Sequence, residues 1–360
     1  MKVIQWYTGS MGAIQVELLR RDRKHDLVGV VAYSPDKVGL DAGEVTGIGA
    51  IGLPIVDAEA GLAIDSDVVL MNGNTLQPDL VDRILRSGKN VITISGAYEM
   101  TGEPEYAQLE AAAQAGGVTL TGGGNMPGLL NDVLPLFMSG YTSNVTRIWT
   151  RERNCHADYR SRTTMAMFYG HPMPLPEQVE AMIGSSSRTG IYYQSAKICA
   201  KAFGLELSDF RLTNYEVAPA PEDFTMPGTG VFVAKGTVAA SRYEFTGFVD
   251  GQPWHTVEME FTARLGLGPQ WRSSMDESEF FVAVDGDPPL RVTWGCGGLL
   301  NLIRLNAARM INLIEPTVAA PPGCRSILEL PCGAAGVLAG KATAPTRNMA
   351  TMRGGWEFAI

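Results

Sequence analysis

The chain has 360 residues, of which 45% are apolar and 19% charged, a balance typical of a folded globular protein with room for two domains. Its formal net charge of −9 argues against nucleic acid or an anionic membrane as the main partner. No apolar run reaches the ~18 residues of a membrane span, and no hydrophobic leader precedes the first expected strand, so we expect a cytoplasmic protein.

Strand and helix patterns alternate in the first third of the chain, which is typical of a parallel sheet with crossover helices. The expected strands are Val3–Trp6, Leu27–Tyr33, Ala63–Met71, Asn90–Ser95 and Gly117–Thr121, and the expected helices are Met11–Arg21, Gln77–Ser87 and Pro104–Ala115. We therefore expect an α/β fold that begins with a doubly wound Rossmann domain over residues 1–130.

The rhythm changes after about residue 145, where strand patterns follow one another. A strand over Val145–Arg153 and helices within Pro176–Phe203 are followed by expected strands over Val231–Ala239, Tyr243–Val249, His255–Ala263, Phe280–Val284 and Leu290–Thr293. Asp250-Gly251 and Asp285-Gly286 are pairs typical of hairpin turns. We expect a second, α+β domain with a mixed or antiparallel sheet over residues 131–330 and an extension over 331–360. For the helix expected near 298–330, the alternative is that it packs back on the first domain.

A glycine-containing turn joins the first strand to the first helix. This strand–turn–helix order presents backbone N–H groups and a helix N-terminus to a pyrophosphate. The expected contacts are Thr8, Gly9, Ser10, Met11 and Gly12. Tyr7 stands where the first glycine of Gly-x-Gly-x-x-Gly belongs, and we expect it to widen the turn or to pack near the adenosine.

Three further strand ends carry small or amide residues, and parallel strands present their carboxyl ends at one edge of the sheet. Any single one of these strand ends is explained equally well as an ordinary turn that binds nothing. Four such ends after successive strands favour a dinucleotide site. The further cofactor contacts we expect are Ser34, Lys37, Asn72, Gly73, Asn74, Thr75, Ser95, Gly96 and Ala97, with Asn125 and Pro127 in the loop after the last strand.

The end of the second strand favours NADP, with NAD possible. NAD sites usually carry an Asp or Glu at the strand tip, whereas Tyr33 and Ser34 stand at the tip here. We expect Ser34 and Lys37 to hold a 2′-phosphate while Asp36 points away after Pro35. The alternative for Lys37 is a solvated surface charge.

Several segments resemble a known group of oxidoreductases. They are Val3–Gly12, Tyr33–Gly39 with Asp41–Gly43, Gly88–Val91, Asn125–Gly128 with Asn131 and Asp132, and Ala308–Ile314 with Ala319–Gly323. These stretches are similar to dihydrodipicolinate-reductase-like oxidoreductases, in the branch of 2,4-diaminopentanoate dehydrogenase and the native amine dehydrogenases. The resemblance covers about residues 1–330. It implies NAD(P) use, chemistry at a C=N or C=O bond, a substrate and dimerisation role for the second domain, and a homo-oligomer, either dimer or tetramer.

One position departs from that branch. Its amine dehydrogenases resemble one another in carrying a glutamate just after the Asn-Val strand, where it handles the ammonia or iminium proton. An ungapped alignment puts Gly96 at that place, with Glu99 three residues further on. Reductive amination is therefore in question, whereas hydride transfer is not.

Hydride transfer to a carbonyl or imine needs a proton donor beside the heteroatom. The first candidate is His156, similar in position to the proton-donating histidines of dihydrodipicolinate reductases, with Asp158 to orient it from the same strand face. Tyr98, Tyr159 and Glu99 are further candidates. For each of them a packing or loop role is the alternative.

Met165, Met167, Phe168 and Tyr169 are expected to line an apolar substrate pocket, with core packing as the alternative. The five cysteines form no Cys-x-x-Cys pair, and the histidines have no partners at ligand spacing, so we expect no metal.

The sequence thus predicts an NAD(P)H-dependent oxidoreductase that transfers hydride to or from a C=O or C=N carbon of a mainly apolar small molecule. A true amine dehydrogenase, which uses ammonia, is the first alternative. The second is a regulatory protein that binds NADP without chemistry.

Overall fold

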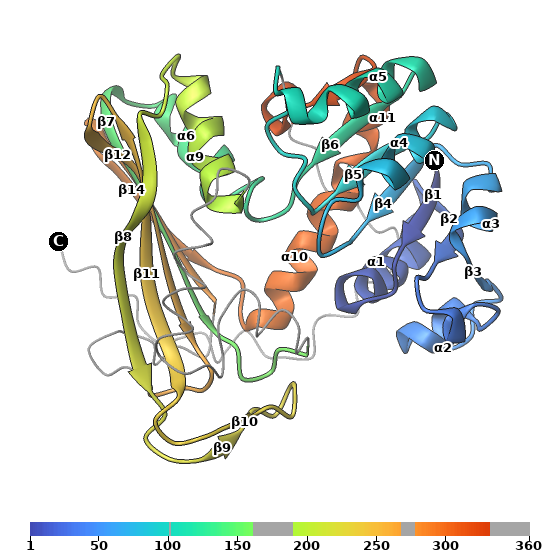
Figure 1. The fold of residues 1–360 in the computed structure, drawn as a ribbon, viewed down its shortest axis with the longest axis horizontal. Coiled ribbons are helices and arrows are strands. Elements are labelled where there is room, and N and C mark those ends of the chain that lie inside the picture. The colour runs from blue at the N-terminus through green and yellow to red at the C-terminus, as the bar shows by residue number, and fades with distance from the viewer. Residues whose placement is uncertain (101, 161–189, 268–277, 332–360) are drawn as a thin grey trace.

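The computed structural model describes residues 1–100, 102–160, 190–267 and 278–331, which form two sheets with helices around and between them (Figure 1). Met165, Met167, Phe168, Tyr169 and the expected extension from residue 332 onward lie outside the described residues.

The first sheet has seven strands in the order β15-β6-β5-β4-β1-β2-β3, and all neighbours are parallel. Its strands are β1 (Lys2–Trp6), β2 (Asp26–Val31), β3 (Ile55–Val56), β4 (Val68–Met71), β5 (Asn90–Thr93), β6 (Thr119–Gly122) and β15 (Gly323–Arg325). The expected doubly wound parallel sheet is therefore confirmed.

Helices cover both faces of this sheet, because its strands bury side chains on both sides. Ile4 belongs to a core with residues of α4 and α5, whereas its neighbour Val3 belongs to a core with residues of α1, α10 and α11. The helices are α1 (Ser10–Arg21), α2 (Ala42–Thr46), α3 (Ala58–Ala63), α4 (Pro78–Arg86), α5 (Ala107–Gly116), α10 (Leu299–Asn312) and α11 (Ile314–Ala319). The chain thus returns to the first sheet near its C-terminal end, and α10 lies against α1.

The second sheet has six strands in the order β14-β13-β7-β12-β11-β8. Its neighbours are antiparallel except for β7 and β12, which are parallel, so the expected mixed sheet is confirmed. Its strands are β7 (Ser143–Cys155), β8 (Asp209–Pro219), β11 (Val238–Val249), β12 (Gln252–Thr262), β13 (Glu279–Asp287) and β14 (Leu290–Gly295). A separate pair, β9 (Phe224–Thr225) and β10 (Phe232–Val233), lies below it in Figure 1.

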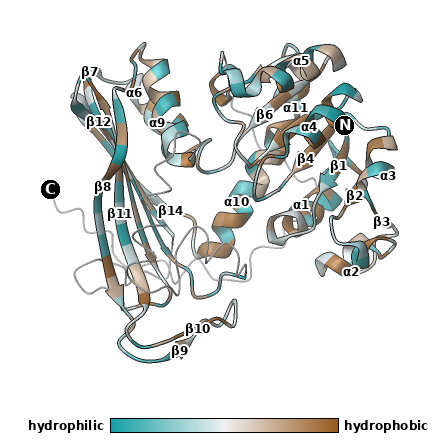
Figure 2. Cartoon of the chain, in the orientation of Figure 1, coloured by the Kyte–Doolittle hydropathy of each residue, from teal (hydrophilic) through white to brown (hydrophobic). Residues whose placement is uncertain are grey.

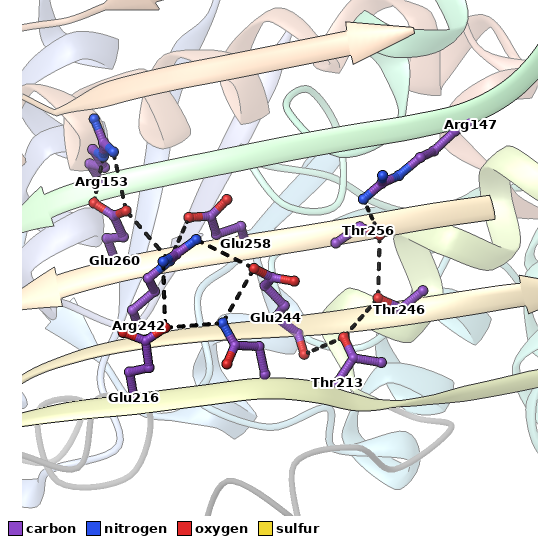
Figure 3. Close-up of polar contacts among 11 residues, drawn as sticks. Arg147, Arg153, Thr213, Glu216, Arg242, Glu244, Thr246, Thr256, Glu258 and Glu260 are labelled. Atoms are coloured by element: carbon purple, nitrogen blue, oxygen red, sulfur yellow. Dashed lines mark hydrogen bonds and ion pairs between the residues drawn. The ribbon is translucent and has the colours of Figure 1, made fainter. Parts of the chain in front are cut away.

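The two faces of the second sheet differ in chemistry. One face packs on α6 (Val133–Ser139) and α9 (Ile191–Ala202), and an aromatic cluster with Tyr192, Tyr243, Phe245 and Phe261 forms there. The other face carries arginines and glutamates in register (Figure 3). Hydrophilic and hydrophobic residues accordingly occur in turn along β8 and β11 (Figure 2).

Two local expectations for this sheet were wrong. The strand expected over Val231–Ala239 is interrupted, because Gly236 has a φ of +85° and turns the chain between β10 and β11. Asp285-Gly286 lies inside β13 and not at a turn. Gly286 is needed there because a Cβ would stand 2.6 Å from the Thr142 hydroxyl. Asp250-Gly251, in contrast, forms the expected hairpin turn with φ values of +50° and +74°.

Candidate functional site

The turn between β1 and α1 brings the backbone of three residues close together. Tyr7 has a φ of +78°, a conformation that a bulky side chain rarely adopts, so it takes up the backbone shape usually given to glycine. A Cβ on Gly12 would overlap the Tyr7 carbonyl oxygen, which explains why α1 needs glycine where it meets the strand end. Gly9 is the N-cap of α1, and no atom lies within 4 Å of the position of its missing Cβ.

Hydrogen bonds join the ends of neighbouring strands. Ser95, after β5, donates through its hydroxyl to the Gly73 carbonyl after β4. The Asn72 amide donates to Gln15 on α1, and the Asn72 Oδ1 atom is buried without a hydrogen-bond partner among the described residues. The four expected strand ends therefore lie at one edge of the sheet, as their order β5-β4-β1-β2 requires.

The tip of β2 differs in one respect from what the sequence suggested. Lys37 donates to the Thr8 hydroxyl at 3.2 Å and thus faces the β1–α1 turn. Asp36 does not point away, because it accepts a hydrogen bond from the Ser34 hydroxyl, which also lowers the pKa of Asp36. A carboxylate therefore lies beside the hydroxyl that was expected to meet a 2′-phosphate.

The loops after β5 and β6 touch each other. A Cβ on Gly122 would overlap the Ala97 carbonyl oxygen, and a Cβ on Gly124 would stand 3.2 Å from Ile94. Gly96 has a φ of +76°, a left-handed conformation that disfavours any side chain at this place. The backbone N–H of Asn125 donates to Asn306 on α10 at 2.6 Å.

These features fit a nicotinamide dinucleotide. The space over Gly9, the N-terminus of the twelve-residue helix α1 and the buried, unpartnered Asn72 oxygen are the kinds of group that meet phosphate, ribose and amide moieties. The residues that would hold it lie at the strand ends: Thr8–Gly12, Ser34, Lys37, Asn72–Thr75, Ser95–Ala97, Asn125 and Pro127.

Tyr98 and Glu99 follow the β5 loop, and both are buried. The Tyr98 hydroxyl donates to the Ile94 carbonyl, and its ring packs in the core shared with α1 and α10; burial raises the Tyr98 pKa. Glu99 forms an ion pair with Lys201 of α9 at 2.7 Å, and its backbone N–H donates to Gln194 of the same helix at 3.3 Å. In these contacts Tyr98 packs within the first domain, whereas Glu99 joins the first domain to α9.

His156 follows the last residue of β7 and is fully buried, with its ring centroid 4.7 Å from that of Phe261. Its backbone N–H donates to the Thr262 carbonyl at 2.7 Å. Asp158 lies in the turn that follows and is exposed. The expected common strand face for His156 and Asp158 is not formed, because β7 ends at Cys155. Tyr159 is half-buried, with its ring centroid 6.0 Å from that of His156.

Known proteins similar to this chain are dehydrogenases. The amine dehydrogenase of Streptomyces virginiae is 28% identical over 353 residues, which cover 92% of this chain and 96% of the relative. The 2,4-diaminopentanoate dehydrogenase of Acetoanaerobium sticklandii is 24% identical over 351 residues, 92% and 93% of the two chains. A solved amine dehydrogenase from Mycobacterium smegmatis has a TM-score of 0.75 at 20% identity, covering 92% of this chain and 96% of its own. No family model matches the chain.

The chain is an NAD(P)-dependent oxidoreductase. The resemblance stated from the sequence is confirmed, and the alternative of a regulatory protein without chemistry is set aside. The structural likeness supports the fold.

Sequence reasoning missed one buried group of this oxidoreductase. Glu152, in the middle of β7, is 3% exposed, and burial raises its pKa to about 8 although a hydrogen bond from Asn154 lowers it. Its carboxylate accepts from the side chains of Asn154 and Asn125, the latter at 3.4 Å. The signal that could have found it is the period of two that puts Thr150, Glu152 and Asn154 on one strand face.

No group of three or more His, Cys, Asp or Glu side chains in the described part of the chain is arranged to hold a metal ion. No helix there combines the length and apolar character needed to cross a bilayer.

Proposed function

We propose that this oxidoreductase acts on a carbon–nitrogen bond and prefers NADP. The observation that carries the proposal is the extent of the match: two dehydrogenases named for amine substrates each align over 92% of the chain and thus over both sheets. Gly96 stands where a glutamate was expected from the resemblance, but this does not oppose action on a carbon–nitrogen bond. Two other buried carboxyl groups, Glu99 and Glu152, belong to the same region.

The reaction consumes an amine, water and the oxidised cofactor, and it yields a ketone, ammonia, the reduced cofactor and one proton; the reverse is reductive amination. When bound, the nicotinamide accepts or donates the hydride. The chain's own groups would bind the cofactor at the strand ends, and the substrate pocket remains the one predicted from the sequence at Met165, Met167, Phe168 and Tyr169, which lie outside the described residues. We therefore expect a mainly apolar substrate.

Ammonium dependence tests this function. We expect the protein to oxidise NADPH with an apolar ketone when ammonium chloride is present, and to do so at least about 10-fold more slowly with sodium chloride instead. Equal rates in the two salts would instead favour reduction of the C=O bond itself, the second candidate.

Lys37 and Asp36 test the cofactor preference. Lys37→Ala should raise the Kd of NADPH about 10-fold and leave that of NADH within about 2-fold, since the lysine faces the turn where the 2′-phosphate would lie. Asp36→Asn, which keeps the shape of the side chain, should lower the Kd of NADPH. Fluorescence titration measures all four constants, and a Lys37→Ala variant that weakens both cofactors equally would argue against NADP.

Assembly and location complete the proposal. We infer a homo-oligomer, dimer or tetramer, built through the second sheet, and a cytoplasmic location without nucleic-acid or membrane partners. Light scattering on the purified protein distinguishes one chain from two or four.

A further inference from the structure

Three fully buried polar side chains meet between the two domains. Glu152, Asn154 and Asn125 are 3%, 3% and 4% exposed. Both asparagines direct their NH2 groups at the Glu152 carboxylate, at 3.4 Å for Asn125. This leaves the Oδ1 atoms of Asn125 and Asn154 buried without a hydrogen-bond partner among the described residues. Buried polar atoms are normally satisfied, so two unpaired acceptors beside one carboxyl group indicate a ligand that brings N–H donors.

The position of this cluster matches the proposed chemistry. Asn125 follows β6 at the carboxyl edge of the parallel sheet, and the preceding residues Gly122 and Gly124 lie against the loop that contains Gly96. Here Gly96 is in the left-handed conformation and has no side chain, while Glu152 reaches the adjoining loop from β7.

We propose that Glu152 is the acid–base group for the substrate nitrogen, and that Asn125 and Asn154 bind its N–H groups through their amide oxygens. The inference rests on the proposed function, because it assigns a nitrogen-bearing substrate: ammonium, a primary amine or its iminium.

Glu152 supplies the proton that lets water leave the carbinolamine. Ammonia adds to the ketone to give a neutral carbinolamine. The Glu152 carboxyl group donates its proton to the carbinolamine hydroxyl, the C–O bond breaks, and water leaves with that electron pair. The products are water, an iminium cation and the Glu152 carboxylate, so one positive and one negative charge form together. The carboxylate then lies beside the iminium nitrogen and stabilises it.

The surroundings of Glu152 suit a proton donor at neutral pH. Arg151 and Arg153 project from the opposite face of β7 to Glu279 and Glu260, so no arginine side chain from these neighbours holds Glu152 ionised. Tyr192 of α9 is a titratable group on its own side, and burial and the Glu152 charge both raise the pKa of that tyrosine. Burial in this setting raises the Glu152 pKa to about 8, which keeps the carboxyl group protonated at pH 7.

Two substrates separate the proton step from hydride transfer. Glu152→Gln should lower the rate of ketone amination with ammonium and NADPH at least about 100-fold, because the amide cannot donate that proton. Reduction of a preformed cyclic imine needs no loss of water and should change less than about 5-fold. Glu258→Gln is the matched control: Glu258 is 1% exposed, lies on the opposite face of the same sheet and should keep both rates.

The outcomes are distinguishable. The inference would be overturned if wild type and Glu152→Gln aminate the ketone at the same rate. It would also be overturned if a folded Glu152→Gln variant loses ketone amination and imine reduction to the same extent. Either result leaves the proposed function standing. A wild type that aminates no ketone and oxidises no amine would instead overturn the proposed function. Glu152→Asp, which keeps a carboxyl group, should recover part of the amination rate and serves if Glu152→Gln does not fold.

A binding readout needs no turnover. In wild-type protein with carboxyl-¹³C glutamate, one signal that is absent from Glu152→Gln should titrate near pH 8. Ammonium chloride should lower that pKa, since N–H donors favour the carboxylate, whereas tetramethylammonium chloride, which has the same charge but no N–H group, should not. The same shift with both salts would contradict a nitrogen site.

Discussion

Gly9 and Gly12 stand three residues apart in the turn before α1, yet the structure gives them different tasks. A methyl group on Gly12 meets the Tyr7 carbonyl oxygen, whereas one on Gly9 meets no atom within 4 Å, and Gly9 has a φ of −68° that alanine adopts readily. Gly12 therefore allows close packing of the helix on the strand. Gly9 leaves open space, where we propose that a phosphate binds.

We expect Gly12→Ala to lower the free energy of unfolding by about 1–3 kcal/mol, as overpacking of a tight contact does. Gly9→Ala should change stability by less than about 1 kcal/mol but raise the Kd of NADPH at least about 10-fold. Urea denaturation and fluorescence titration of both variants check this. Normal NADPH affinity in Gly9→Ala would contradict the assigned cofactor site.

Glu152 predicts an unusual pH dependence of stability. Its folded pKa of about 8 lies above the ordinary 4.5, so the unfolded chain releases a proton between these pH values that the folded chain keeps. The free energy of unfolding should therefore fall as pH rises from about 5 to 8, by at most about 1.4 kcal/mol per pH unit from this group. Glu152→Gln should lose that slope in urea denaturation at several pH values, and an unchanged slope would count against the raised pKa.

Residue patterns pointed more readily to the strand ends proposed for the cofactor than to Glu152, the proposed acid–base group. The glycines and amides of the strand ends were visible because each follows an apolar run directly. Glu152 was not, because Arg151-Glu152-Arg153 resembles a solvated charge run along the chain. Only the sheet shows that the two arginines and the glutamate project to opposite faces.

At the scale of elements, β7 joins the two chemistries of the second sheet. One of its faces carries Glu152 and Asn154 towards the first domain, and the other contributes Arg153 to the charged ladder of Figure 3. In that ladder Arg242 is bonded to Glu258 at 2.9 Å and lies within 3.8 Å of Glu216, Glu244 and Glu260. A line of hydroxyls from Thr213 through Thr246 to Thr256 continues it to Arg147.

Arg242→Met should destabilise the protein by about 3–5 kcal/mol, because it leaves the buried Glu258 carboxylate without its main partner. Adding Glu258→Gln should restore part of that loss. Urea denaturation of the two single variants and the double variant measures the coupling. Strictly additive effects would show that the two side chains do not stabilise each other.

Elements were predicted well where their pattern is local. The parallel strands β1, β2, β4, β5 and β6 and the helices α1 and α4 follow from apolar periodicity and turn residues, and the structure confirms them. The strand expected over Ala63–Met71 begins only at Val68, because Ala63 ends helix α3, and β3 and β15 were not expected. β8 was not expected, although Phe210 and Leu212 alternate with polar residues in it. The glycine at position 286 was misread as a turn signal. It allows the close approach of Thr142, which directly precedes β7, and no local sequence pattern records that contact.

At the scale of the whole molecule, the chain crosses from the first sheet to the second and returns through α10, α11 and β15. Met126, in the loop after β6, packs against the buried aromatic cluster of the second sheet, so this loop and the sheet share one core. This arrangement places the proposed nitrogen-binding cluster beside the loop that follows β6, because Asn125 of that loop contacts Glu152 of β7.

Transfer of nitrogen from ammonium into product tests the central claim most directly. The protein would be incubated with an apolar ketone, NADPH and ¹⁵N-ammonium chloride, and the product identified by mass spectrometry. We predict one ¹⁵N-labelled amine for each NADPH oxidised. An alcohol product without ¹⁵N would contradict action at a carbon–nitrogen bond.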